Sequence, residues 1–427
     1  MPFMQQQRPA RPKPMGTLSL PGPERWFDLL ICALIAPLML PVLLLLSILA
    51  YLRNGRILDA EPRLGRQGSF LHYTFAGQQR GHKLALLLNI VRGDMSWIGP
   101  QALTVAEAAK VPANCIQRFK LRPGLVSPWT LQQRVGIAHQ AEHLYNYAEL
   151  ADLSLRARIG LLGRALLSLL LNGNRQRPQP AQLKIFGIAI DNLKLQPALD
   201  WIMQQASGTR PSLLVFVNPH CLNIAYRQQA YRQVLQQADR VLPDGIGIKL
   251  GCRIQGVELA ANLNGTDLFP LLCEQAARSG HSLYLLGGRP GIAQAVAENM
   301  QQRYPGLIIA GTQHGYFSAA EEPAIIDNIN ASGARFLFVA MGVPRQELWL
   351  AKQQQHLRVP LSLGVGGLFD FYSGRIPRAP LWLREIGLEW SWRLLQEPGR
   401  MWRRYLIGNP LFLYRVWREK RAGKSRS

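Results

Sequence analysis

The stretch RVLPDGIGIKLG at residues 240–251 contains the unit that decides the fold of the second half of the chain. A short apolar run ends at Leu242, the residues Pro243-Asp244-Gly245 form a turn, and a helix follows. The same order of β-rich run, turn and helix recurs on both sides of this stretch after residue 183. The predicted strands are KIFGIAI, SLLVFVN, RVLPDG, SLYLLGG, LIIAGT, RFLFVAMG and PLSLGVGG. This alternation predicts an α/β fold in which helices wrap a parallel sheet.

Asp244 follows one of these strands directly. Ligands of such sheets bind outside the carboxyl ends of the strands, so the Asp244 carboxylate is a candidate site residue. It could act as a general base that takes a proton from a sugar hydroxyl as the hydroxyl attacks an anomeric carbon. A carboxylate in this place could equally cap the helix that follows. The local sequence leaves both interpretations open.

Two further strand ends carry candidate site residues. The segment LYLLGGRPGIAQAVAENM (283–300) reads as strand, glycine-rich turn and helix. Gly287 and Gly288 would let backbone N–H groups approach an anion, although such turns also simply close a strand–helix unit. After the strand RFLFVAMG, a helix opens in VPRQE (343–347). Gln346 is therefore also expected to face the crevice.

Three arginines near the C-terminus form a candidate anion site. Arg393, Arg400 and Arg403 are spaced by seven and three residues, which places them on one face of a helix. Pro398 lies between them and could start a new helix. Guanidinium groups suit a diphosphate because they donate paired hydrogen bonds. A face that contacts lipid headgroups is the alternative.

No metal site is expected. The segment His139-Gln-Ala-Glu142-His143 fits an HxxEH pattern, but a pattern of five residues also occurs by chance and no third ligand is evident. The sequence contains no DxD pair that would hold a metal beside a nucleotide. We therefore predict neither a metal nor another cofactor.

The composition indicates a large folded protein with an anionic partner. At 427 residues, 48% of them hydrophobic, the chain is long enough for two folded cores. Its net charge of +23 favours nucleic acid, acidic lipid headgroups or phosphorylated substrates. The five cysteines are scattered and include no CxxC pair, which argues against a disulfide framework and a structural zinc site. A reducing cytoplasm fits this pattern.

The run from Leu29 to Leu52 contains no charged residue. It is long enough to cross a bilayer core of roughly 30 Å, and a buried helix of a soluble domain is the alternative. Pro37 and Pro41 lie in its middle, where proline kinks a helix. Basic residues flank both ends, whereas a straight crossing normally has a more basic side. We therefore expect an apolar hairpin that enters and leaves the membrane by the cytoplasmic face.

Basic residues gather beside this run and again at the C-terminus. Residues 1–182 contain 21 Lys and Arg against 9 Asp and Glu, a placement that favours anionic lipid over nucleic acid. Residues 375–427 contain 13 Lys and Arg and five of the ten tryptophans, which is typical of a membrane interface, although nucleic-acid sites also combine these residues.

The predicted segments are a disordered basic leader (1–23), a mainly helical membrane-associated module (24–171), a linker (172–182), an α/β domain (183–374) and a membrane-associated C-terminal appendage (375–427).

Residues 183 to about 418 resemble the WecG/TagA/CpsF glycosyltransferases, glycosyltransferase family 26. The resemblance is carried by LPDGIGIKL, NGTDLF, LLGG-PG, HGYF, FVAMGVPRQE, GVGGLFDFYSGRIPRAP and GLEWSWRLLQEPGRMWRRYL. It implies a Rossmann-like α/β fold, with helices on both faces of a parallel sheet. It also implies metal-independent, inverting transfer from a UDP-sugar to an undecaprenyl-diphosphate-linked acceptor.

The resemblance also assigns roles to residues. It makes Asp244 the catalytic base and implies catalytic roles for Gln346 and Arg400. The predicted substrate-binding residues are Asn218, Gly245, Gly287, Gly288, Asp267, Arg393, Arg403, Phe216 and Asn262. Phe216 stands where the family carries Thr, and Asn262 where it carries Arg. Both changes remove polar groups from the pocket, so the sugar specificity of relatives does not transfer to this chain.

Residues 24 to about 171 resemble the bacterial polyprenyl-phosphate sugar-1-phosphate transferases. The matching segments are ERWFDLL, RLGRQGSF, LLLNIVRGDMSWIGP and LRPGLVSPW. The active family has an Asp-Glu pair seven and six residues before the residue that is Asn89 here. This chain has His82 and Lys83 instead. We therefore predict a degenerate, inactive module that anchors the chain.

Together these features predict a bacterial hexosyltransferase at the cytoplasmic face of the inner membrane, in exopolysaccharide or capsule synthesis. The expected partners are the UDP-sugar, the undecaprenyl-diphosphate-linked acceptor and anionic lipids, with other polysaccharide-assembly enzymes as candidates and no nucleic acid. Two alternatives stay open. One is an inactive membrane scaffold of the same pathway, and the other is a sugar-1-phosphate transferase that acts through the N-terminal module.

Overall fold

The computed structural model describes residues 22–66, 68–77, 81–135, 145, 147–150, 153–172 and 177–424. Contacts divide the chain into two compact units, one within Met1–Ser127 and Gln140–Leu162 and one within Pro128–His139 and Gly163–Ser427. This division differs from the predicted linker at 172–182, because helices that precede the linker pack with the second unit. Most of the predicted leader and the segment His139–His143 lie outside the described residues.

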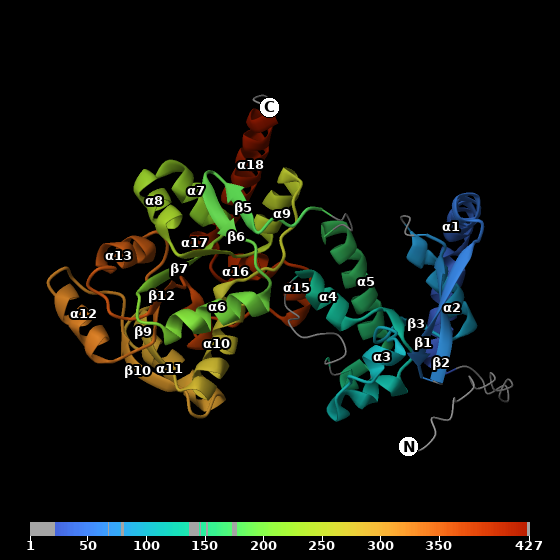
Figure 1. Cartoon of the computed structure of the whole chain (residues 1–427), viewed down its shortest axis with the longest axis horizontal. Helices are drawn as coiled ribbons and strands as arrows, with labels where there is room; N and C mark the ends of the chain where they lie inside the picture. The colour runs from blue at the N-terminus through green and yellow to red at the C-terminus, as the bar shows by residue number, and fades with distance from the viewer. Residues whose placement is uncertain are drawn as a thin grey trace, which may run out of the picture. The chain divides into compact units, whose positions relative to one another are not determined.

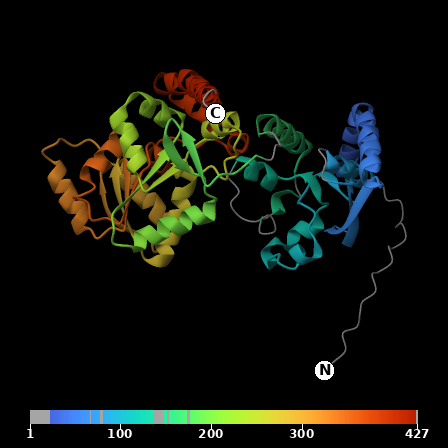
Figure 2. The same cartoon turned by 45° about the horizontal axis from the view of Figure 1, so that its top comes forward.

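The apolar run of the first unit forms one helix, α1 (Pro23–Asn54), drawn in blue in Figure 2. The predicted hairpin is wrong, because the leucine-rich run contains no Gly, Asn or Asp that would reverse the chain, and Pro37 and Pro41 lie inside the helix. At 1.5 Å per residue the helix is about 48 Å long. Its most apolar window has a mean hydropathy of 2.9 and none of it is buried. By length and composition, α1 fits a membrane anchor or a signal sequence.

The rest of the first unit adds two pairs of short strands to short helices, and helical residues outnumber strand residues within 24–171, as predicted. Its elements are β1 (Leu58–Gly65), β2 (Gly68–Phe75), η1 (His82–Ala85), α2 (Leu86–Arg92), β3 (Ser96–Ile98), α3 (Val105–Ala108), η2 (Ala113–Lys120), β4 (Gly124–Val126) and η4 (Ala148–Leu150). The strands β1 and β2 form an antiparallel pair. The side chain of Asn89 holds β2 to α2, since it donates to the Leu71 carbonyl at 2.6 Å and accepts from the Tyr73 N–H at 3.0 Å.

The second unit contains the predicted parallel sheet. Its strands are β7 (Ser212–Val217), β8 (Arg240–Pro243), β9 (Ser282–Gly287), β10 (Ile308–Gln313), β11 (Phe336–Ala340) and β12 (Leu361–Gly364). They lie in the order β10-β9-β11-β12-β7-β8, and all neighbours are parallel. Six of the seven predicted strands are therefore confirmed.

The seventh predicted strand, KIFGIAI, is a hairpin instead. It forms β5 (Gln182–Ile185) and β6 (Ile188–Asp191), which pair antiparallel. The two residues between them, Phe186 and Gly187, have φ angles of 53° and 76°. Two successive left-handed residues make the tight turn that suits the twist of a hairpin. The prediction of one strand was wrong because the apolar run conceals this turn.

Helices cover both faces of the parallel sheet (Figure 1). One core lies under α7 (Pro219–Arg227), α8 (Gln229–Gln237), α9 (Ile246–Gln255), α12 (Glu322–Ala331), α13 (Arg345–Gln353) and α18 (Gly408–Lys424). The other lies under α6 (Leu195–Ser207), α10 (Gly265–Ser279), α11 (Ile292–Arg303) and α14 (Leu368–Tyr372). Alternate strand residues enter opposite cores, as the pleat requires. In β7, Val215 belongs to the first core and Leu214 to the second.

The C-terminal appendage is a series of short helices that ends in a core helix. It consists of α15 (Leu381–Glu385), α16 (Glu389–Gln396), α17 (Pro398–Trp402), the π-helical turn η5 (Arg403–Ile407) and α18. Phe412 and Val416 of α18 are fully buried in the first core. The second unit also includes α4 (Pro128–Val135) and the second half of α5 (Leu155–Asn172). The end of the chain is thus part of the α/β fold.

Candidate active site

A cavity of about 540 Å³ lies at the carboxyl ends of β7, β8, β11 and β12, and the appendage also lines it. Its size is in the range of small-molecule sites. Ten of the twelve predicted site residues line it, namely Phe216, Asn218, Asp244, Gly245, Asn262, Asp267, Gln346, Arg393, Arg400 and Arg403. Because the carboxyl ends of these parallel strands lie at the same edge of the sheet, they bring together residues that are far apart in the sequence.

Asp244 lies at the end of β8 with its carboxylate held by one neighbour. Its backbone N–H donates to the Val217 carbonyl of β7 at 2.8 Å. Its Oδ2 accepts from Nδ2 of Asn218 at 3.2 Å. The following helix begins after Gly245 and takes no side-chain cap, so the capping role is wrong. Burial raises the pKa of Asp244, and the Asn218 hydrogen bond and the positive charge of Arg404 oppose this rise.

Asn218 and Asn262 fix the position of this carboxylate. The Oδ1 of Asn218 caps α7 by accepting from the N–H groups of His220 and Cys221 at 3.1 and 3.2 Å, so its amide nitrogen is directed to Asp244. The Oδ1 of Asn262 accepts from the Gly245 N–H at 2.7 Å. Gly245 has a φ of 91°, which glycine adopts without strain. The Asp244–Gly245 turn is therefore held on both sides.

Gln346 lines the cavity and joins the loops that follow β11 and β12. Its side chain is only 1% exposed, and its Oε1 accepts from the N–H groups of Gly342 and Gly366 at 3.1 and 3.0 Å. Its Nε2 donates to Oε1 of Glu347 at 2.7 Å. Sequence reasoning predicted a catalytic role for Gln346. These contacts hold the loops after β11 and β12 together, and because Gln346 also lines the cavity its catalytic role stays a prediction.

The carboxyl group of Glu347 is expected to make folding stability depend on pH. It is fully buried, its Oε2 has no hydrogen-bond partner among the residues that the structure describes, and burial raises its pKa to about 7. The unfolded chain therefore loses this proton at lower pH than the folded chain, and folding stability falls as pH rises from about 4.5 to about 7. We expect Glu347→Gln to remove this dependence, on the order of 3 kcal/mol by pH 8. Unfolding midpoints of both proteins at pH 5 and pH 8 measure it, and parallel pH profiles would contradict it.

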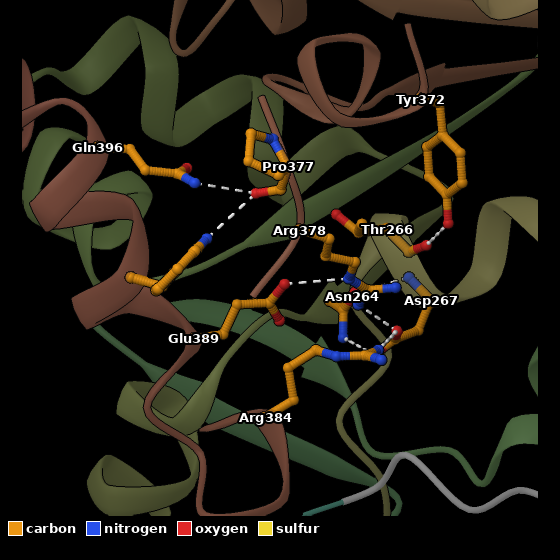
Figure 3. Close-up of polar contacts among 10 residues, drawn as sticks. Asn264, Thr266, Asp267, Tyr372, Pro377, Arg378, Arg384, Glu389 and Gln396 are labelled. Atoms are coloured by element: carbon orange, nitrogen blue, oxygen red, sulfur yellow. Dashed lines mark hydrogen bonds and ion pairs between the residues drawn. The ribbon is translucent and has the colours of Figure 1, made fainter. Parts of the chain in front are cut away.

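Asp267 anchors the appendage to the start of α10 (Figure 3). Its carboxylate forms an ion pair with Arg378 and lies 4.0 Å from Nη1 of Arg384. Arg378 also donates to Oε1 of Glu389 at 3.1 Å. Asn264 caps α10 and donates to the same carboxylate at 2.7 Å. Asp267 thus lines the cavity, and its negative charge is paired with arginines of the appendage.

Phe216 closes the cavity with an apolar surface. Its ring is 7% exposed and belongs to the core under α6 and α10. An added Cβ on Gly265 would lie 3.4 Å from this ring, so the ring fills the space beside the start of α10. The pocket therefore has an aromatic wall at Phe216.

Gly287 and Gly288 do not line this cavity. Gly287 instead lets β9 approach β11, because a Cβ at this position would lie 2.5 Å from the Ala340 carbonyl oxygen. The N–H of Gly288 donates to that same carbonyl at 3.0 Å. The structure therefore shows a role for these glycines in the packing of β9 against β11 and not in lining this cavity.

The predicted arginines line the cavity from three different helices. Arg393 of α16 lies over the Phe371 ring at 4.9 Å, with Nη2 3.5 Å from Oδ2 of Asp370. Arg400 of α17 has a 60% exposed side chain whose Nη1 lies 3.3 Å from Oε1 of Glu397. The helix α16 ends at Gln396 and α17 begins at Pro398, so the three arginines do not share one helix, and the alternative in which Pro398 starts a new helix is confirmed. Arg403 begins η5.

Sequence reasoning missed Arg404 and His220, which both line the cavity. The charge of Arg404 lowers the pKa of Asp244 and of His220, and burial contributes most to lowering the pKa of His220, to about 4. His220 is therefore neutral near pH 7. The adjacent pair Arg403-Arg404 was visible in the sequence. The π-helical turn makes regular helical spacing a poor guide to which residue faces the cavity.

The family model of the WecG/TagA/CpsF glycosyl transferases matches residues 183–426, which is more than half of the chain. The chain belongs to this family. The match leaves residues 1–182 without a family assignment, so their resemblance to sugar-1-phosphate transferases stays a prediction. Among the described residues, no group of three His, Cys, Asp or Glu side chains could hold a metal ion.

Two curated members of the WecG/TagA/CpsF family illustrate the relationship. A Bacillus spizizenii N-acetylglucosaminyldiphosphoundecaprenol N-acetyl-beta-D-mannosaminyltransferase is 34% identical over 211 residues, 49% of this chain and 80% of that enzyme. A Staphylococcus aureus enzyme of the same name is 28% identical over 251 residues, 58% of this chain and 97% of that enzyme. This chain is thus a glycosyltransferase of the WecG/TagA type with additional residues before the shared domain.

Proposed function

We propose that the chain is an inverting hexosyltransferase that moves a sugar from a UDP-sugar to an undecaprenyl-diphosphate-linked saccharide. The observation that carries this proposal is the position of Asp244 in a cavity that five arginines also line. A carboxylate with a raised pKa suits proton removal near neutral pH, and guanidinium groups suit a diphosphate. The names of the relatives describe transfer to a diphosphoundecaprenol-linked sugar.

The reaction proposed here is a single displacement. One Asp244 oxygen takes the proton of the acceptor hydroxyl, whose oxygen forms a bond to the anomeric carbon. The bond between that carbon and the UDP oxygen breaks, and its electron pair leaves with UDP. The arginines stabilise the negative charge that develops on the diphosphate. No step in this scheme requires a metal or another cofactor.

A panel of UDP-sugars, tested with synthetic lipid-diphosphate sugars and the purified full chain, tests this proposal. We expect transfer with inverted anomeric configuration from at least one donor, with equal rates in the presence of EDTA. Product mass and NMR of the new linkage are the measurements. The absence of transfer from every donor would support the inactive scaffold instead, and Phe216 and Asn262 are the substitutions that would explain it.

Replacing Arg400 by alanine is expected to lower kcat by about tenfold or more with a smaller change in KM. A contact to the leaving group acts most strongly in the transition state, when charge has moved onto it. The side chain is 60% exposed, so folding should be unaffected. Steady-state kinetics with a saturating acceptor measures the effect. An unchanged kcat would remove Arg400 from the catalytic role.

The proposed location of the protein is the cytoplasmic face of a bacterial inner membrane, to which it would be attached. The apolar surface of α1 is exposed to the surroundings. Trp382, Trp402 and Trp417 of the appendage are between 41% and 51% exposed and lie among basic residues, an arrangement that favours anionic lipid headgroups. Exopolysaccharide or capsule synthesis is the process that such an acceptor serves, and other enzymes of that assembly remain candidate partners.

We expect the N-terminal module to have no sugar-phosphotransferase activity. Covalent transfer of a phosphosugar needs a carboxylate nucleophile, and His82 and Lys83 occupy the places of the expected carboxylates. The measurement uses full-length protein carrying Asp244→Asn, with UDP-sugars and undecaprenyl phosphate, so that the two activities are separated. Release of UMP together with a lipid-diphosphate sugar would make the protein bifunctional.

A further inference from the structure

The appendage helices that line the cavity are too short to be stable alone. The helices α15 and α17 have five residues each, and α16 has eight residues and no buried one. Isolated helices of this length are not populated in water. Their order over the cavity must therefore come from contacts with the rest of the second unit. Two sets of contacts hold the helix α15 in place.

One set of contacts comes from Asp267 at the start of α10 (Figure 3). Asp267 holds Arg378 and Arg384, and Arg378 also holds Glu389. A small apolar cluster of Ala379, Leu383 and Ile386 supports the same segment. These contacts fix α15 on the side of α10 and the substrate cavity.

A second set of contacts reaches α15 from the helices that precede the catalytic domain. Glu385, the last residue of α15, is 2% exposed. Its Oε1 accepts from Nε2 of Gln132 in α4 at 3.0 Å, and its Oε2 accepts from Nη1 of Arg164 in α5 at 2.5 Å. Both carboxylate oxygens are thus bonded to side chains more than 220 residues away. On α5, Ala165 and Ser168 beside Arg164 are also buried.

A buried carboxylate in this arrangement holds its partners firmly. Its two oxygens are removed from water and depend on one charged and one neutral donor, and loss of a donor leaves a buried charge short of a partner. Charge-assisted hydrogen bonds of this kind are also stronger than neutral ones. The residues Gln132 and Arg164 lie outside the stretch 183–426 that the family model matches. The shared domain alone therefore does not provide this support.

We propose that Glu385 is a positioning residue through which α4 and α5 hold the appendage in its ordered, substrate-binding arrangement. The link runs along α15, because Glu385 faces the two helices and the adjacent Arg384 lines the cavity. Gly387, Glu389 and Trp390, which follow directly, line the cavity too. The N-terminal part of the chain thus serves binding as well as anchoring. This inference rests on the proposed function for its kinetic consequences only.

The expected kinetic effect follows from the fraction of molecules in which the appendage is ordered. If loss of the Glu385 contacts leaves the appendage ordered only a tenth of the time, the apparent affinity for the UDP-sugar falls by the same factor. A saturating donor restores the ordered state, so kcat changes little. Partial misfolding has the opposite signature, since it lowers the amount of active enzyme and leaves KM unchanged. The split between KM and kcat therefore distinguishes positioning from mere structural support.

Two variants of the full chain test the proposal, Arg164→Met and Glu385→Gln. We expect KM for the UDP-sugar to rise about tenfold with kcat within about twofold. Hydrogen–deuterium exchange should be faster at the amides of residues 381–407 and unchanged in β7 and β11. Arg164→Met should have the larger effect, because it leaves the charge of Glu385 buried. The double variant Arg164→Met with Glu385→Gln should therefore exchange more slowly than Arg164→Met alone.

The control is Glu274→Gln, which breaks an exposed ion pair with Arg278 on α10 and should change neither KM nor exchange. Reversal of the pair, as Glu385→Arg with Arg164→Glu, is expected to restore KM to within about threefold. Unchanged exchange and KM in both single variants would overturn the proposal. The exchange measurement needs no substrate. A response in exchange from a chain that transfers no sugar would therefore retain the positioning role and reject the proposed function.

Discussion

Asparagine in place of Asp244 is expected to lower the transfer rate by about 10²–10⁴, the usual cost of losing a general base. The amide has the same shape as the carboxylate, and its oxygen can still accept from Nδ2 of Asn218. We therefore expect normal folding and normal binding of UDP. Single-turnover transfer measures the loss, and calorimetric titration with UDP measures binding.

The matched control for this variant is Asp200→Asn on α6. Asp200 is exposed and accepts from the Gln196 side chain, so transfer should stay within about twofold of the original rate. Near-normal turnover of the Asp244 variant would mean that another group or water takes the acceptor proton. The proposed chemistry would then need a different base.

Alanine in place of Arg404 is expected to have the second-largest effect, a loss of about 10²–10³ in kcat/KM. Arg404 lines the cavity and its charge lowers the pKa of Asp244. Its removal raises that pKa further, so the base is protonated up to a higher pH. The acid limb of the pH–rate profile should accordingly move to higher pH. A profile measured from pH 5 to 9 shows both effects.

Arg278→Ala is the control, since Arg278 is an exposed residue of α10 paired with Glu274. It removes one positive charge from the protein but none from the cavity. An Arg404 variant whose rate falls without any movement of the acid limb would show that Arg404 acts on the diphosphate alone. A variant with unchanged rate and unchanged profile would remove Arg404 from the site.

Most of the α/β fold could be predicted because its strands are short apolar runs that end in turns. The pattern failed at KIFGIAI, where Phe186 and Gly187 reverse the chain without the Asn-Gly or Asp-Gly signal of a typical hairpin. It failed again at α1, where two prolines suggested a hairpin within what is one helix. In both places, the local sequence permits two conformations.

The candidate site was predicted well where residues follow strands and less well elsewhere. Asn218 and Asp244 lie where the ends of neighbouring parallel strands must meet. Gly287 also ends a strand, but β9 lies on the far side of β11 from β12, β7 and β8, and this order is not encoded in any local pattern. Arg404 depends on a π-helical turn, and Glu385 on partners more than 220 residues away. Such pairings become visible only in three dimensions.

The burial of Phe412 and Val416 in the α/β core has a consequence for how the enzyme can open. The appendage is a span of chain fixed at both ends, by Asp267 and its neighbours at one end and by α18 at the other. A tethered segment of this kind keeps its arginines at a high effective concentration around the cavity even when it detaches. In the reaction proposed above, release of UDP would need only a local displacement of α16 and α17, and the next donor would meet a segment that is already close by.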